Sequence, residues 1–337
     1  MIKDSINKIT SRVDLSIDES RLLLNEIMKG NLNNSQIAGL LLSLKTKGET
    51  SNEVAGFALA ILDNAIKISD FSDSVDVCGT GGDDSGTFNI STAAAFVVAG
   101  AGYKVAKHGN RSISSKSGSA DVLIELGIDV NLSPEQSKQA LEKVGISFLF
   151  APNYHPAMKY VMPVRRELAT KTIFNILGPL TNPAGTKRQA IGTFNDKAAE
   201  LMAEASLHLD QEKVCFVCTE NKFDEILLNG SSKIIEVKNG QINSFETDNK
   251  SLGLPEVQLS EVQGDDAKTN AGIILEIFQN KKLAPAYYVV VANAALGIYA
   301  ASDNLELKES VQIAEESVQS GKALEKLEML RDFGVKN

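Results

Sequence analysis

The chain has 337 residues, of which 43% are hydrophobic and 23% charged, and its net charge is −9 at pH 7. These values are typical of a soluble globular protein with two domains, or with one large α/β domain and a helical addition. The acidic total gives no support to general nucleic-acid binding, and no apolar run has the length of a membrane span.

The cysteines and the first residues predict a cytoplasmic location. The chain opens on a polar segment without an apolar signal core, and its three cysteines are few enough for a reducing compartment. Cys215 and Cys218 have the C-x-x-C spacing, but they lie in the strand-like stretch VCFVC and lack a second pair for zinc. We interpret them as buried strand cysteines.

Residues 3–70 predict helices, because apolar side chains recur at helical spacing in 22–28, 37–44 and 54–68. No convincing strand precedes residue 74, so we expect a small helical domain first. Strand and helix patterns alternate afterwards, which predicts an α/β domain with a mostly parallel central sheet covered by helices. The expected strands are 75–78, 103–106, 146–150, 214–218, 234–237 and 286–291. The expected helices are 91–101, 118–126, 134–144, 156–169, 196–208, 266–278, 292–301 and 307–318, with a charged helix after 322 and a polar, irregular excursion at 238–264.

The stretch DVCGTGGDDSGTFNIST at 76–92 predicts a phosphate site. Its glycines let the backbone approach a ligand and expose N–H groups, and an alanine-rich helix begins near Asn89, Ser91 or Thr92 with a Ser/Thr cap at hand. The spacing differs from that of a Walker loop and from G-x-G-x-x-G. A flexible surface turn is the alternative.

The charge distribution supports an anion site in the middle of the chain. Residues 85–195 carry a net charge of +6, whereas the rest of the chain carries −15. KHGNR at 107–111 and the serine-rich 114–119 follow the second expected strand, so we expect them beside the glycine turn. Lys107 is a suitable phosphate partner, and His108 is either a site residue or a packed structural histidine.

An arginine pair and a carboxylate pair are further candidate site residues. A helix beginning at Pro156, after His155, carries Arg165 and Arg166, whose planar forks suit a carboxylate or phosphate. Adjacent positions on a helix point about 100° apart, so we expect one arginine to face the site and the other to face solvent. Asp224 and Glu225 are either solvated charge or carboxylates for a divalent cation such as Mg²⁺.

Seven segments, in one order, resemble the anthranilate phosphoribosyltransferase family of tryptophan biosynthesis. The similarity is dense from about residue 74 to 185, and stretches near 293–299 and 320–325 also look familial. Seven motifs in order are far more specific than any one of them. The segments are CGTGGD, TFNIST, VAKHGNR, SSKSGSADVL, YHPAMK, PVRREL and TIFNILGPLTNPA.

The resemblance implies a helical dimerisation domain, residues 1–70 with roughly 165–185, and a homodimer. It implies an α/β domain of the nucleoside phosphorylase class at 71–164 and 186–337, with the active site in the cleft between the two. The implied ligands are phosphoribosyl pyrophosphate, anthranilate and Mg²⁺, with no nucleic acid and no membrane.

Residue roles also follow from the resemblance. The positions implied for phosphoribosyl pyrophosphate are Gly79, Gly81, Gly82, Asp83, Thr87, Asn89, Ser91, Thr92, Lys107 and Ser119. Those implied for anthranilate are Gly79, His108, Asn110, Arg165 and Gly178, and those for the metal are Ser91, Asp224 and Glu225.

The implied reaction transfers the phosphoribosyl group to the amine of anthranilate, giving N-(5-phosphoribosyl)anthranilate and pyrophosphate. The amine is neutral at pH 7, so a strong general base is not obligatory and we nominate no acid–base residue. The growing charge on pyrophosphate must be stabilised, and we expect backbone donors, Lys107 and Mg²⁺ to do so electrostatically.

The chain departs from the family pattern at two places. Asp84 stands where the family usually has glycine, which adds a carboxylate near the diphosphate. The stretch 219–223 replaces a His-Gly-x-Gly-Leu-like pattern, and we expect the loss of two glycines to stiffen this loop and to affect metal affinity. Two other functions stay open, a pyrimidine nucleoside phosphorylase and a non-catalytic nucleic-acid-binding member of the superfamily.

Overall fold

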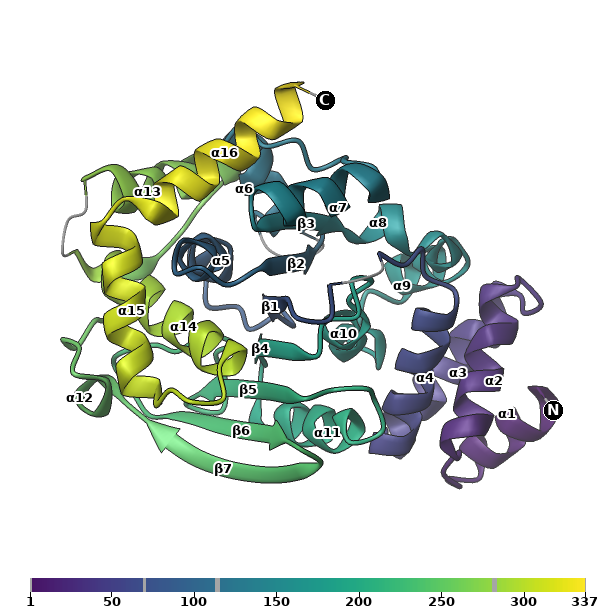
Figure 1. Ribbon diagram of the computed structural model, residues 1–337. Coiled ribbons are helices and arrows are strands. Elements are labelled where there is room, and N and C mark those ends of the chain that lie inside the picture. Colours follow the sequence, from purple (N-terminus) through teal and green to yellow (C-terminus); the bar gives the residue numbers. More distant parts are fainter. Residues whose placement is uncertain (1, 69–70, 113–115, 281–283, 337) are drawn as a thin grey trace.

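The computed structural model describes residues 2–68, 71–112, 116–280 and 284–336. The chain begins with four helices, shown in purple in Figure 1: α1 (Ile2–Thr10), α2 (Ile17–Met28), α3 (Asn34–Lys47) and α4 (Ser51–Asp63). Ser16, Asn33 and Thr50 begin α2, α3 and α4 with capping boxes, which satisfy backbone donors at each helix start. Their sequence therefore fixes where these helices begin.

A seven-stranded sheet follows, in the order β3-β2-β1-β4-β5-β6-β7. The pairs from β3 through β5 are parallel, whereas β6 and β7 are antiparallel to their neighbours. The predicted mostly parallel sheet is confirmed. The strands are β1 (Val75–Gly79), β2 (Val105–Gly109), β3 (Ile146–Phe150), β4 (Arg188–Gly192), β5 (Lys213–Thr219), β6 (Ser232–Lys238) and β7 (Gln241–Thr247).

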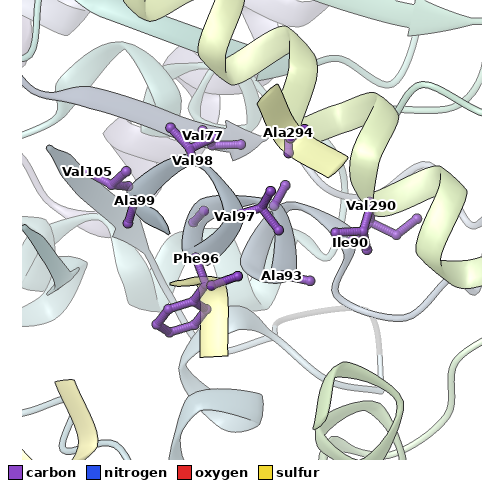
Figure 2. Packing of buried hydrophobic residues seen from close by; sticks show 14 of the residues in the cluster. Val77, Ile90, Ala93, Phe96, Val97, Val98, Ala99, Val105, Val290 and Ala294 are labelled. Carbon is purple, nitrogen blue, oxygen red and sulfur yellow. The ribbon is translucent and has the colours of Figure 1, made fainter. Parts of the chain in front are cut away.

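Helices cover both faces of the sheet. Because successive side chains of a strand point to opposite faces, each strand contributes to a core on either side. Val75 and Val77 join the core that α5 (Ile90–Gly100) and α14 (Pro285–Ala301) fill, as Figure 2 shows for Val77, Val97 and Ala294. Cys78 joins the opposite core, together with α4 and α11 (Asp196–Ser206). This second core runs without a break into the N-terminal helices.

The remaining elements connect or flank these layers. The 3₁₀ turn η1 contacts α2, and α9 contacts α3, so 156–168 lies against the N-terminal helices. No helix in the described part of the chain has both the length and the apolar character to cross a bilayer. These elements are α6 (Ser119–Glu125), α7 (Pro134–Lys143), α8 (Ala151–Tyr154), η1 (Pro156–Tyr160), α9 (Met162–Leu168), α10 (Phe174–Leu177), η2 (Gly178–Thr181), α12 (Asn249–Leu252), η3 (Leu259–Val262), α13 (Ala267–Asn280), α15 (Leu307–Gln319) and α16 (Lys322–Lys336).

The predicted strand at 286–291 was wrong and two strands were missed, and the single helix predicted at 156–169 is instead the 3₁₀ turn η1 followed by the short helix α9. Residues 286–291 form no strand but the first part of α14, which starts with Pro285 in its first turn and is buried nearly all round, so its apolar run shows no helical period. Strand β4 was missed because it opens on the polar pair Arg188 and Gln189. Strand β7 was missed because it is a mostly exposed edge strand inside the expected excursion at 238–264.

Close packing of α2 on α4 depends on Gly56. A Cβ atom there would lie 2.4 Å from the Ile17 carbonyl oxygen and 2.6 Å from Ser20 Cβ. We expect Gly56→Ala to lower the free energy of unfolding by about 1–3 kcal/mol, because backbone atoms must move apart. Gly272 in α13 is exposed with nothing within 4 Å of its Cβ position, so Gly272→Ala should raise stability by about 0.5–1 kcal/mol. Urea unfolding of both variants checks this, and equal effects would contradict it.

Candidate active site

The candidate site lies at the carboxyl ends of β1, β2 and β4. The strand order reverses between β1 and β4, and ligands of open α/β sheets bind at such a switch point. The last residues of these two strands, Gly79 and Gly192, pair with each other. The predicted glycine turn therefore leaves the sheet at the position where a ligand is expected.

Asp224 fills the space that these two glycines leave. A Cβ on Gly79 would lie 2.9 Å from Asp224 Oδ2, and one on Gly192 would lie 1.6 Å from the Asp224 carbonyl oxygen. Gly81 and Gly82 have φ of 65° and 74°, in the left-handed region that favours glycine. The Gly81 N–H donates to Asp224 Oδ2 at 2.8 Å. The glycine sequence is thus required both by the turn and by this carboxylate.

Glu225 caps the helix that follows the turn. Its Oε1 accepts a hydrogen bond from the Ser91 N–H at 3.0 Å, in the first turn of α5. Asn89 occupies the N-cap position without a side-chain cap bond, so the predicted Ser/Thr cap was wrong. The Asn89 amide instead donates to the Ser117 carbonyl at 3.2 Å and accepts from Asn270 at 3.0 Å. A carboxyl oxygen therefore lies at a helix N-terminus, the position where the helix dipole favours negative charge.

Lys107 joins the second strand to β1 and α5, the two elements that flank the glycine turn. It is 4% exposed, and its Nζ donates to the Val77 carbonyl at 2.5 Å and lies 3.4 Å from Ser91 Oγ. Burial lowers its pKa, whereas Asp76 and Glu225 act to raise it. The expectation that KHGNR lies beside the glycine turn is confirmed.

Burial and mutual repulsion at the two carboxylates of this site outweigh the effect of the nearby Lys107, which acts to lower the pKa of Glu225. Burial and the neighbouring Asp83 raise the pKa of Asp224, and burial followed by Asp224 raises that of Glu225. The described residues contain no cluster of three or more His, Cys, Asp or Glu side chains suited to a metal ion. Two carboxylates beside the Ser91 hydroxyl fit Mg²⁺, which takes few protein ligands and completes its shell with phosphate and water.

His108 is both packed and at the site. Its Nδ1 lies 3.3 Å from the Gly178 carbonyl oxygen, and its Nε2 lies 3.2 Å from His155 Nε2. Burial lowers the pKa of His108 to about 3 and that of His155 to about 4, so both rings are neutral at pH 7. Sequence reasoning noticed His155 but assigned it no role at the site.

Sequence reasoning also missed a buried carboxylate beneath the site. Asp76 on β1 is 0% exposed and accepts hydrogen bonds from Asn182 Nδ2 at 2.8 Å and from the His108 N–H at 3.2 Å. Asn182 also donates to the Ala106 carbonyl at 2.8 Å. Burial raises the pKa of Asp76 to about 6, against the opposing effect of Lys107. An acidic residue between two valines of a strand was the available signal.

Arg165 is half-buried with its guanidinium over the Phe174 ring, 5.4 Å from the ring centroid. Burial lowers its pKa, and it makes no ion pair with another described residue. Arg166 is exposed, which confirms that one arginine of the pair faces solvent. The guanidinium fork of Arg165 is therefore available for an anionic ligand.

The other predicted site residues are more dispersed. Asn110 is exposed, and its carbonyl oxygen accepts from Ser119 Oγ at 3.2 Å. Asp83 binds the Ser85 hydroxyl, whereas Thr87 forms an isolated bridge with Gln263. Thr92 Oγ1 is buried without a hydrogen-bond partner in the described structure. Ser114 and Ser115 lie outside the described residues.

Both departures from the family pattern fall on left-handed backbone. Asp84 has φ of 56°, and Glu220 and Asn221 have φ of 52° and 51°. Side chains hold the second turn, since Glu220 Oε1 accepts from the Ser231 N–H at 2.8 Å and Asn221 Oδ1 from the Asp196 N–H at 2.9 Å. These hydrogen bonds stabilise a left-handed turn conformation that glycine would adopt more readily.

Two family models match the chain. One, described as the helical bundle domain of a glycosyl transferase family, matches residues 3–65, and the other, the a/b domain of that family, matches residues 72–324. An anthranilate phosphoribosyltransferase from Thermoanaerobacter sp. (strain X514) is 46% identical over 99% of this chain and 98% of its own length. One from Geobacillus kaustophilus is 43% identical over 98% of both.

Solved structures agree with these matches. The anthranilate phosphoribosyltransferase of Thermus thermophilus has a TM-score of 0.92 and 36% identity, covering 98% of this chain and 99% of its own. The Saccharomyces cerevisiae enzyme in complex with PRPP and Mg has a TM-score of 0.90 and 26% identity, covering 100% and 98%. With its predicted fold confirmed and both domains matched, the chain belongs to the anthranilate phosphoribosyltransferase family.

Proposed function

We propose that this chain transfers the phosphoribosyl group of phosphoribosyl pyrophosphate to the amine of anthranilate, releasing pyrophosphate and forming N-(5-phosphoribosyl)anthranilate. The observation that carries this proposal is the pair of carboxylate oxygens on the Gly81 and Ser91 N–H groups. These oxygens mark the positions where phosphate oxygens are favoured, at a glycine turn followed by a helix N-terminus. The full-length identity to named relatives supports the same reaction.

The diphosphate would lie on the glycine turn and the start of α5. Gly79, Gly81, Gly82 and Asp83 form this turn, and Lys107 provides a buried cation beside it. Thr92 Oγ1 is a buried hydroxyl without a hydrogen-bond partner among the described residues, which suits a phosphate ligand. The other residues proposed to bind phosphoribosyl pyrophosphate are Thr87, Asn89, Ser91 and Ser119.

Anthranilate would bind where the helical segment meets β2. Arg165 offers for the carboxylate a guanidinium that bonds the Met162 sulfur at 3.9 Å and pairs with no carboxylate among the described residues, with Asn110 as a further polar contact and Gly79 on the turn side. His108 and Gly178, joined at 3.3 Å, would line the path of the ring. Because His108 is neutral, it does not compete with Arg165 for the carboxylate.

Asp224, Glu225 and Ser91 are the residues that would hold Mg²⁺. When bound, the ion would neutralise charge on the diphosphate and so help pyrophosphate to leave. Lys107 and the backbone donors of the turn stabilise the same charge, because they are fixed before the reaction begins. No side chain needs to remove a proton from the neutral amine before attack, so positioning supplies the rest of the rate.

The domain division, the oligomeric state and the cellular location complete the proposal. We place the domain division at 1–70 with roughly 165–185 against 71–164 and 186–337, because α9 contacts α3. The helical domain would form the homodimer, and three buried free cysteines suit the cytoplasm. A pyrimidine nucleoside phosphorylase and a nucleic-acid-binding protein are disfavoured, because Arg165 suits an aromatic acid and the chain is acidic overall.

The first test is an anthranilate fluorescence assay. We expect fluorescence to decay only when protein, phosphoribosyl pyrophosphate and Mg²⁺ are all present, and to persist in EDTA. A parallel assay with uridine and inorganic phosphate should release no uracil. Uracil release, or no anthranilate decay at any Mg²⁺ concentration, would contradict the proposed function.

Asp84 offers a test of charge at the diphosphate site. It is exposed at φ 56°, directly after the turn, so its carboxylate repels the diphosphate through solvent. We expect Asp84→Asn and Asp84→Gly both to lower KM for phosphoribosyl pyrophosphate, by about two- to fivefold at low salt and less at high salt. Asparagine tolerates the left-handed backbone, so it removes the charge alone. An effect confined to Asp84→Gly would show that backbone freedom, and not charge, is responsible.

A further inference from the structure

Lys171 reaches from the helical segment to the glycine turn. Its Nζ donates to the Gly82 carbonyl oxygen at 2.5 Å, and the same ammonium lies 4.2 Å from the centroid of the Phe194 ring. Phe194 is itself tied to the turn, because its N–H donates to Thr80 Oγ1 at 3.2 Å. The lysine is therefore aligned along the turn and is still exposed to solvent.

The segment that carries Lys171 is fixed on the helical side. Ala169 ends α9 in the left-handed region, with φ of 45°, and so turns the chain away from the helix axis. Thr170 Oγ1 accepts from Lys45 Nζ of α3 at 2.6 Å, and the Thr172 N–H donates to Asn175 Oδ1 at 3.0 Å. Contacts on both sides of Lys171 thus hold its backbone while its side chain crosses to the α/β domain.

Acidic residues outnumber cations around the glycine turn, so a second cation beside Lys107 would be stabilised there. Asp83, Asp84, Asp224 and Glu225 all lie in or against this region, whereas Lys107 is the cation buried beneath it. Lys171 makes no ion pair with a described carboxylate, and its Nζ donates to the neutral carbonyl of Gly82. An ammonium on a carbonyl gains more from a phosphate oxygen, because hydrogen bonds between two ionised groups are stronger.

We propose that Lys171, which belongs to the helical segment, is a further binding residue for the diphosphate of phosphoribosyl pyrophosphate. When the diphosphate binds, Lys171 Nζ exchanges the Gly82 carbonyl for a phosphate oxygen. This exchange couples substrate binding to the junction of the two domains. This proposal rests on the proposed function. The Cβ position of Gly82 lies 3.4 Å from Lys171 Cε and 3.6 Å from its Nζ, so the side chain lies directly over the turn. The ammonium is therefore held at the turn where the diphosphate is proposed to bind.

The test compares Lys171→Met, Lys171→Arg and the control Lys159→Met. Lys159 is also an exposed lysine, with its ammonium 5.0 Å from the Tyr160 ring, so the control removes the same charge away from the turn. Binding of phosphoribosyl pyrophosphate with Mg²⁺ is measured by calorimetry, and KM and kcat are measured for both substrates. Thermal unfolding reports whether each variant is folded.

We expect Lys171→Met to raise both Kd and KM for phosphoribosyl pyrophosphate by about tenfold, which corresponds to about 1.4 kcal/mol. KM for anthranilate at saturating cosubstrate should stay within about twofold, and Lys171→Arg should recover most of the lost affinity. Lys159→Met should match the wild-type protein. A Kd for phosphoribosyl pyrophosphate within about twofold of wild type in Lys171→Met would overturn the proposal, even if kcat or stability fell.

The calorimetric measurement separates this proposal from the proposed function. If wild-type protein binds phosphoribosyl pyrophosphate but consumes no anthranilate, the proposed reaction fails while the role of Lys171 is still measured. If wild-type protein transfers the phosphoribosyl group and Lys171→Met binds the cosubstrate as tightly, only the role of Lys171 fails.

Discussion

The buried hydrogen bond between Asp76 and Asn182 is the contact on which the site depends. An ionisable carboxyl in the middle of a parallel sheet is costly unless its oxygens are satisfied, and here two donors satisfy them. One donor is the backbone of β2 at His108, and the other belongs to the segment after η2. The hydrogen bonds of Asp76 therefore join β1 and β2 to the returning segment and fix the position of that segment relative to the sheet.

A single short segment then carries several site contacts. Phe174 in α10 supports the guanidinium of Arg165, and Gly178 four residues later binds His108. Because Asn182 anchors the end of this segment, the proposed anthranilate residues share one support. The paired imidazoles, both neutral at pH 7, leave the arginine as the cation in this part of the site. In the proposed function the diphosphate would meet the lysines at the turn and the anthranilate carboxylate would meet Arg165, so the two anions would have different partners.

The sequence predicted the architecture well where patterns are local. Apolar periodicity, glycine turns and the strand–helix alternation located most elements, because each depends on neighbouring residues. It failed where burial overrides pattern, as in α14, and where a strand is polar and peripheral, as in β7. At the candidate site, the motif residues were nominated by type, spacing and family resemblance. Asp76 and the proposed Lys171 were not nominated, because their partners Asn182 and Gly82 are distant in sequence.

The carboxylates on the turn explain how a site for a highly charged ligand is kept in shape without that ligand. Backbone N–H groups aimed at solvent would gain from any rearrangement that satisfied them, so Asp224 and Glu225 hold Gly81 and Ser91 in place. Burial and mutual repulsion leave these carboxylates in need of positive charge. In the proposed function, a diphosphate arriving with Mg²⁺ would bring oxygens for the N–H groups and a cation for the carboxylates together. Each would supply what the other displaces, so the proposed substrate and metal complement each other at this turn.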